Sequence, residues 1–443
     1  MMKHNHGGGD YKAGSITLGG AVAMGTGVMI GAGIFALTGQ IAELAGTLFP
    51  IAFIVGAIVT GFSAYSYVKM SNAWPSAGGI AMILQKCYGP GAVAAGAALL
   101  MALSMVIAES LVARTFAAYL LRPFNIDGGP LVPILAVGVI LFAFLVNIAG
   151  NRSIGLFSLV MAAIKIGGIA IFGFAALWSS GFDFAAGTED ISAHGATGFM
   201  ASVALAILAF KGFTTITNSG AEITDPHRNV GRAIAISIAL CVVVYLLVAF
   251  GVGSSLTIDQ IVDARDYSLA EAAKPALGEA GFLLTVLLAV VATASAVLAS
   301  VFAVSRMLAM LTDMKMIPHS HFGMTGPIQR HTLVYTVVVA SGLAVFFDLG
   351  RIASLGAFFY LVMDMVVHWG VWRFRREDIG ARSPILIAAL CFDAIVLTAF
   401  TAMKLQSDPM IVILAGAGIF TVFFFERSYL SNWLAPQYGN RDE

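Results

Sequence analysis

Long apolar runs alternate with short polar stretches along almost the whole chain. A helix that crosses a bilayer needs about 20 mostly apolar residues. The runs are continuous and do not alternate as barrel strands would, so they favour helices. The pattern predicts an all-α membrane protein with twelve transmembrane helices, at residues 16–45, 48–68, 90–121, 131–149, 154–178, 196–220, 232–254, 279–311, 333–347, 353–371, 384–403 and 409–426.

Basic residues gather at one set of helix ends. With the amino terminus in the cytoplasm, sixteen Lys and Arg residues lie on the inner side and five on the outer side. Because short inner loops are enriched in Lys and Arg, this bias predicts that both termini are cytoplasmic, with tails at 1–14 and 428–443. The short loops favour a bacterial inner membrane.

Composition excludes several classes of protein. Hydrophobic residues make up 59% of the chain and charged residues 11%, against about a quarter charged in a soluble domain. A formal net charge of zero gives no electrostatic reason for a nucleic-acid partner. The three cysteines lie in separate apolar runs, which argues against a disulfide framework or a zinc site. His4 and His6 could hold a metal, but a polar tail is the favoured interpretation, so no metal or cofactor is expected.

Two of the predicted helices contain residues that interrupt a helix. The first has four glycines between Gly25 and Gly33, each costing about 1 kcal/mol of helix propensity relative to alanine. The sixth has Lys211-Gly212-Phe213 followed by a polar run. Close helix packing through small residues is one explanation. Unwound backbone that lines a cavity is the other.

The spacing of these breaks suggests a fold and a site. They lie in the first and sixth helices, an offset of five that is expected for two inverted five-helix repeats at 15–180 and 195–376, with two further helices at 383–427. Discontinuous helices at matching positions point to a binding site near the bilayer midplane. Half-helix ends attract a carboxylate at one terminus and an ammonium at the other, which fits a zwitterionic amino acid.

The chain resembles the amino acid–polyamine–organocation superfamily, in particular its proton-coupled bacterial and archaeal amino-acid permeases. The resemblance is carried by the glycine-rich turn at 27–35 with Ala45-Gly46, by Phe210-Lys211-Gly212-Phe213 with the residues up to Ile234, and by 272–284 with Ile317-Pro318. It implies that backbone amides of the first break bind a substrate carboxylate and that an aromatic residue of the sixth helix closes over the ligand. The implied substrate site comprises Ile30, Gly31, Ala32, Gly33, Phe210, Gly212 and Thr293.

Lys165 lies near the middle of the fifth predicted helix, more than about 15 Å from either end. A charge at that depth costs at least a few kcal/mol when it has no partner. The resembling proton-coupled permeases carry a lysine at this place. We therefore expect Lys165, with Ser295 as a neighbour, to couple transport to protons. A static charge that holds three helices together is the alternative.

Other charges within the predicted helices have two interpretations each. Glu109 and Lys211 stand where the family is usually apolar. They either form a buried ion pair, the favoured interpretation, or bind a charged group of the substrate. Asp364 and His368 share a helix face at i,i+4. They could relay protons, although a structural pair is favoured.

Together these observations predict a secondary active transporter, not an enzyme, that moves amino acids by alternating access with inward protons. Its partners are the substrate, protons and the lipid bilayer. A polyamine, another organic amine or an inorganic cation is the alternative substrate, and a membrane-embedded enzyme is a remote one. The sequence leaves open which amino acid is carried, whether by symport or exchange, and the oligomeric state.

Overall fold

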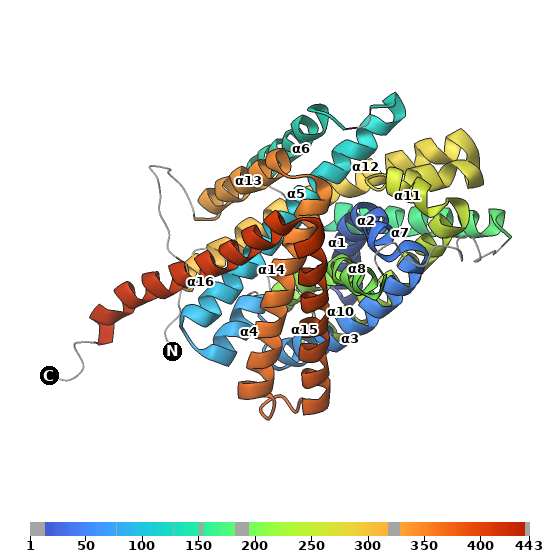
Figure 1. The fold of residues 1–443 in the computed structure, drawn as a ribbon. Helices are drawn as coiled ribbons and strands as arrows, with labels where there is room; N and C mark the ends of the chain where they lie inside the picture. The colour runs from blue at the N-terminus through green and yellow to red at the C-terminus, as the bar shows by residue number, and fades with distance from the viewer. Residues whose placement is uncertain are drawn as a thin grey trace.

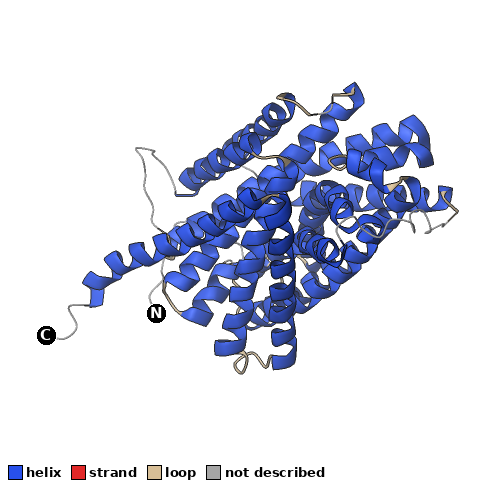
Figure 2. Cartoon of the chain, viewed as in Figure 1, coloured by secondary structure: helices blue, strands red, loops and turns tan. Residues whose placement is uncertain are grey.

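A computed structural model describes residues 14–76, 78–126, 128–149, 154–181, 195–317 and 328–438. Within these ranges the regular elements are helices (Figures 1 and 2), apart from an isolated parallel bridge between Ile16 and Ile223. Ten helical stretches are long and apolar enough to cross a membrane, and two shorter apolar stretches cover Leu18–Gly31 and Arg330–Phe346. The prediction of an all-helical membrane protein is confirmed.

Each of the twelve predicted segments contains helix. The first part of the chain forms α1 (Leu18–Val28), η1 (Met29–Ile34), α2 (Phe35–Ala45), α3 (Phe49–Ala73), α4 (Gly79–Tyr88), α5 (Ala92–Leu121), α6 (Leu131–Ala149) and α7 (Ile154–Ser179). The second part forms α8 (Gly195–Phe210), η4 (Lys211–Phe213), α9 (Thr214–Asn218), η5 (Gly220–Glu222), α10 (Pro226–Ser255), α11 (Ile258–Asp263), α12 (Ser268–Asp313), α13 (Ile328–Phe346), α14 (Leu349–Gly370), η6 (Val371–Arg375), α15 (Ser383–Ser407) and α16 (Pro409–Tyr438). The inverted-repeat relation between 15–180 and 195–376 stays a prediction.

The structure differs from the sequence prediction at several boundaries. The short helices α4 and α11 were not expected, because neither is long enough to give a transmembrane signal. The eighth helix begins earlier than predicted, at Ser268, and bends at Gly278, whose φ of 66° is accessible mainly to glycine. Helix α16 continues to Tyr438, where a tail was expected from residue 428.

The two predicted breaks are changes of helix winding. Between α1 and α2 the chain forms a π-helix at Met29–Ile34, and the flanking Val28 and Phe35 keep helical dihedrals. Between α8 and α9 it forms a 3₁₀ turn at Lys211–Phe213. The expectation of unwound backbone is therefore corrected: the chain stays helical, and the wider and tighter turns displace it from the regular α-helical path. Such changes within a helix often mark functional positions.

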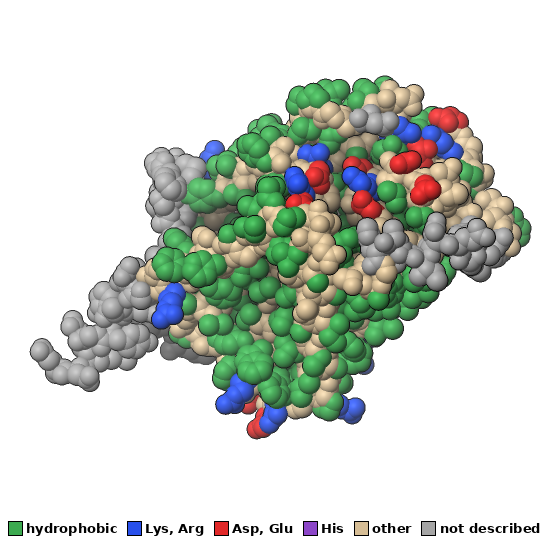
Figure 3. Space-filling model, in the orientation of Figure 1, with side chains coloured by type: hydrophobic (Ala, Val, Ile, Leu, Met, Phe, Trp, Pro, Cys, Tyr) green, Lys and Arg blue, Asp and Glu red, His purple; other side chains and the backbone are tan. Residues whose placement is uncertain are grey.

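The helices pack around these two breaks. Helix α5 contacts α12 and α14, α10 contacts α3 and α7, and α8 lies against α2, α3 and α15. Apolar side chains on the outer helices are exposed, such as Ile134 on α6 and Phe420 on α16. Figure 3 shows a broad hydrophobic surface between charged groups near α11 and charged groups at the loop after α14. This distribution suits a lipid-facing belt.

We predict that replacing Gly33 with alanine destabilises the protein. A Cβ atom there would lie 2.6 Å from the Ala209 carbonyl oxygen and 2.5 Å from the Tyr245 hydroxyl, and overpacking of this kind costs about 1–3 kcal/mol. Gly138→Ala in α6 is the control, because its Cβ would meet nothing within 4 Å. Thermal unfolding in detergent should show a lower midpoint for Gly33→Ala only. Equal midpoints would contradict the close contact between η1 and α8.

Candidate substrate and coupling site

The two helix breaks are in direct contact. A Cβ atom on Gly212 would lie 2.7 Å from the backbone nitrogen of Met29, and one on Gly33 would lie 2.6 Å from the Ala209 carbonyl oxygen. Only glycine, which lacks a Cβ, lets the two backbones approach this closely. Gly33 and Gly212, which helped to predict the breaks, therefore also allow the two breaks to touch.

Tyr245 on α10 joins both breaks through its hydroxyl, a role that the sequence analysis missed. Its oxygen lies 2.6 Å from the Met29 carbonyl oxygen and 3.1 Å from the Ala209 carbonyl oxygen. A phenol donates one hydrogen, so the two carbonyl groups share it. The Tyr245 ring also packs on Phe210, with ring centroids 4.8 Å apart. A tyrosine inside an apolar run was the only sequence signal for this contact.

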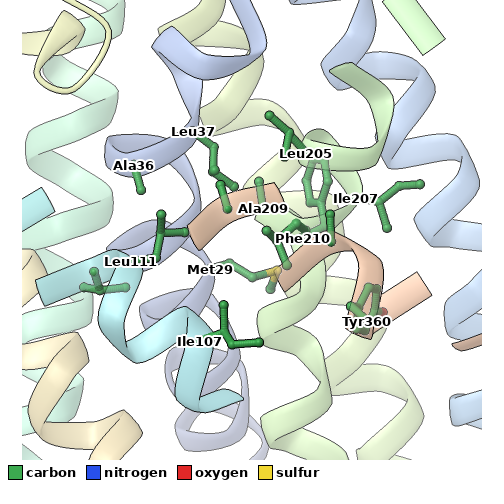
Figure 4. Packing of buried hydrophobic residues seen from close by; sticks show 14 of the residues in the cluster. Met29, Ala36, Leu37, Ile107, Leu111, Leu205, Ile207, Ala209, Phe210 and Tyr360 are labelled. Atoms are coloured by element: carbon green, nitrogen blue, oxygen red, sulfur yellow. The ribbon is translucent and has the colours of Figure 1, made fainter. Parts of the chain in front are cut away.

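The predicted substrate residues lie around this contact and are buried from solvent. Ile30, Phe210 and Thr293 are fully buried, and the Thr293 hydroxyl donates to the Ala289 carbonyl oxygen of its own helix at 2.6 Å. Ala32 belongs to η1, but its side chain lies outside the described residues. Figure 4 shows Met29 and Phe210 with Ile107 and Leu111 of α5 nearby, and all four are buried apolar side chains.

Lys165 lies against the first break. Its side chain is 4% exposed, and its Nζ is 3.5 Å from the position that a Cβ of Gly31 would take. No hydrogen bond or ion pair joins it to another residue in the described part of the chain. Ser295, its expected neighbour, donates its hydroxyl to the Ala292 carbonyl oxygen at 3.0 Å within α12.

The favoured ion pair between Lys211 and Glu109 is wrong. Lys211 Nζ instead donates to the carbonyl and hydroxyl oxygens of Ser104, at 2.8 and 2.5 Å, and lies 5.5 Å from the ring centroid of Tyr360. Ser104 precedes Glu109 by five residues, so the two occupy different faces of α5. The fully buried Glu109 carboxylate has no hydrogen-bond partner among the described residues.

Asp364 and His368 form part of a larger buried cluster. His368 Nε2 lies 3.4 Å from Asp364 Oδ2 and 3.4 Å from Asp393 Oδ2. Asp393, for which the sequence suggested no partner, comes from α15 and completes the group. Tyr67 on α3 donates to Asp364 Oδ1 at 2.5 Å. The proposed relay through Asp364 and His368 stays a prediction.

The sequence of this chain matches a known protein family over most of its length. The model of that family, described as amino acid permease, matches residues 16–425. The chain belongs to the amino acid permease family. It is therefore a membrane transporter and not an enzyme, as predicted.

Three relatives illustrate the range of this permease family. The Escherichia coli inner membrane transport protein YbaT is 29% identical over 374 residues, covering 83% of this chain and 85% of the relative. The Lactococcus lactis branched-chain amino acid permease BcaP is 27% identical over 378 residues, covering 78% of each chain. The Bacillus subtilis methylthioribose transporter is 25% identical over 350 residues, covering 73% of this chain and 72% of the relative.

Two sets of polar contacts join helices through residues that precede and follow α10 in the chain. After α10, Gln40 donates to Asp266 at 2.9 Å and Arg265 pairs with Glu43 at 2.8 Å. Burial raises the pKa of the Asp266 carboxyl above its usual value, while the charges of Arg265 and Arg114 oppose the shift. Before α10, Glu222 pairs with Arg306 of α12.

Replacing Tyr245 with phenylalanine should reduce transport as well as stability. The substitution removes the hydroxyl that joins the two carbonyl groups, and the loss of a buried hydrogen bond costs about 0.5–1.5 kcal/mol. The control is Tyr88→Phe, which removes a hydroxyl bonded to the Val366 carbonyl oxygen at 2.6 Å, away from both breaks. Uptake into liposomes and thermal unfolding are measured for both variants. We expect reduced uptake only in Tyr245→Phe. Equal uptake by the two variants would show that the Tyr245 hydroxyl has no specific role in transport.

Proposed function

We propose that this permease moves amino acids by alternating access, driven by protons that enter through Lys165. The observation that carries the proposal is the contact of the two glycine-containing breaks beside a buried lysine. In this proposal both termini are cytoplasmic, in a bacterial inner membrane. The contacts of Arg265 and Asp266 then form the outer gate, and the contact of Arg306 with Glu222 forms the inner gate.

The two breaks supply groups for both charges of an amino acid. In this proposal η1 opens at its glycines when the substrate binds, and the backbone amides freed there receive the carboxylate. The carbonyl oxygens of Met29 and Ala209 are acceptors that already share one hydrogen from Tyr245. An α-ammonium has three hydrogens to donate, so it can replace the hydroxyl at these carbonyls when the site opens.

The apolar side chains near the two breaks suggest which class of substrate side chain would bind there. Met29, Phe210, Ile107 and Leu111 line the region between η1, α8 and α5 (Figure 4). An apolar substrate side chain would bury its surface here without leaving polar groups unpaired. A neutral, apolar amino acid is therefore the proposed substrate. The name of BcaP, a branched-chain amino acid permease, agrees with this class.

The position of Lys165 supports proton coupling. Its amine is buried against η1 with no counter-charge among the described residues. A charged ammonium without a partner is costly at this depth, so closure of the site favours release of its proton. The amine binds a proton again when the site faces the more acidic side. An ammonium in this place also repels sodium, which argues against sodium coupling.

A second candidate is transport of an organic amine. The observation that favours it is the Glu109 carboxylate, which is fully buried and lacks a hydrogen-bond partner among the described residues. A protonated amine could neutralise this group. Lys211 does not compete for Glu109, because it is bound to Ser104.

Lys165→Ala should abolish proton-driven accumulation and leave counterflow exchange intact. Proteoliposomes are loaded at pH 7.5, diluted to pH 5.5 and supplied with radiolabelled leucine. Lys69→Ala is the control, because Lys69 lies at the end of α3 and donates to the Gly380 carbonyl oxygen at 3.1 Å. Accumulation by Lys165→Ala at the wild-type level would remove this lysine from the coupling mechanism.

The substrate class is tested with Glu109→Gln. The wild type and the variant are compared with neutral, acidic and basic amino acids, a diamine and rubidium. For a neutral amino-acid carrier we expect uptake of apolar amino acids by both proteins. Uptake of the diamine alone, lost in Glu109→Gln, would replace the amino-acid proposal with the amine carrier.

A further inference from the structure

A buried cluster of polar side chains joins three helices beside the sixth-helix break, where its member Tyr67 packs on Phe213. It consists of Asp364 and His368 on α14, Asp393 on α15, and three hydroxyl residues on α3. The donor atoms of Asp364, His368 and Asp393 all lie within 4.8 Å of one another, and all three side chains are fully buried.

Several atoms in this cluster face one another without hydrogen-bond partners. Neither Asp393 carboxylate oxygen has a partner among the described residues, and neither does His368 Nε2. These atoms nevertheless approach each other, with 3.4 Å between His368 Nε2 and Asp393 Oδ2. Buried polar atoms normally have a partner. Their convergence on one point indicates a ligand shared between them.

Residues of α3 form hydrogen bonds with His368 Nδ1 and with both oxygens of Asp364. Ser66 Oγ lies 2.8 Å from His368 Nδ1, and Ser63 and Tyr67 donate to the two oxygens of Asp364 at 2.6 and 2.5 Å. If Nδ1 carries the hydrogen and donates it to Ser66, Nε2 presents its lone pair to the centre. Outer contacts of this kind orient histidine and carboxylate ligands at metal sites.

The charge of the cluster also favours a bound cation. Two ionised carboxylates in a buried site carry two negative charges, and among the described residues their ion-pair partner is His368, which can offset at most one of them. A divalent ion would neutralise both and leave His368 uncharged. We propose that Asp364, His368 and Asp393 form a binding site for a divalent transition-metal ion of the zinc class.

The spacing favours this class of ion. Metal–ligand bonds of about 2.0–2.1 Å at tetrahedral angles separate neighbouring donors by about 3.3–3.4 Å. Both distances from His368 Nε2 to the aspartate oxygens are 3.4 Å. Asp364 Oδ2, His368 Nε2 and one oxygen of Asp393 supply three donors, one from each residue, and a water would take the fourth tetrahedral position. Calcium and magnesium prefer more oxygen ligands or retained water, so the imidazole selects against them.

This ion would fasten helices α3, α14 and α15 to one another. It lies outside the substrate site, so the inference does not depend on which substrate is carried. The same atoms cannot bind the metal and relay protons together. The relay suggested for Asp364 and His368 is therefore the competing outcome of the experiment.

The test measures metal in the full-length protein. His4 and His6 are replaced by alanine in every sample, and purification avoids metal-affinity steps, so that zinc bound to the polar tail is excluded. Mass spectrometry should find about one zinc ion per chain after desalting. Asp393→Asn and His368→Gln should lose this ion, whereas the control Asp378→Asn, an exposed aspartate paired with Arg375, should keep it. Ser66→Ala should weaken zinc binding about tenfold.

A second measurement uses a protein with the cluster unchanged, so its result does not depend on whether the variants fold. The wild-type protein, produced in zinc-depleted medium with cobalt, should show the visible absorption of tetrahedral Co²⁺. Absence of metal from the wild type in both experiments would overturn the proposal and leave protons as the neutralising cations. Zinc retained equally by Asp393→Asn would also overturn it, because the binding would be adventitious.

Discussion

The hydroxyl of Tyr245 connects the two interrupted helices on which the rest of the site depends. It reaches carbonyl oxygens in both breaks, at Met29 and Ala209, while Gly33 and Gly212 allow the backbones to touch. A backbone carbonyl in a bilayer must be satisfied within the protein. One hydroxyl hydrogen is shared between the two carbonyl groups, and each carbonyl oxygen can accept more than one hydrogen bond. A ligand with more hydrogens to donate can therefore compete for the same acceptors.

In the proposed mechanism the protein must open before a substrate can enter. The proposed site residues are buried, and polar contacts join the helices before and after α10 in the chain. These contacts lie near or at the surface, where single ion pairs contribute about 0–1 kcal/mol. Opening these contacts one set at a time is therefore the less costly step. Substrate entry additionally requires the two breaks to separate.

The sequence predicted the fold better than the site. Hydropathy placed the helices because span length is fixed by bilayer thickness, and the glycines located both breaks. The winding of the breaks was not predictable, since π and 3₁₀ turns depend on what the displaced backbone contacts. The Lys211–Glu109 pair failed because the rotation of α5 relative to η4 is set by packing. Asp393 lacked an assigned partner because its neighbours come from distant helices.

The buried cluster and the sixth-helix break are linked through one side chain. Tyr67 donates to Asp364 and also packs its ring edge-on against Phe213, with centroids 5.3 Å apart. Lys211, at the other end of the same 3₁₀ turn, lies over Tyr360, one turn before Asp364 on α14. The turn is thus held from two sides by residues of the cluster's helices. An ion that fixes α3 against α14 would therefore also hold this turn in place, which gives the cluster a structural role beside the proposed site.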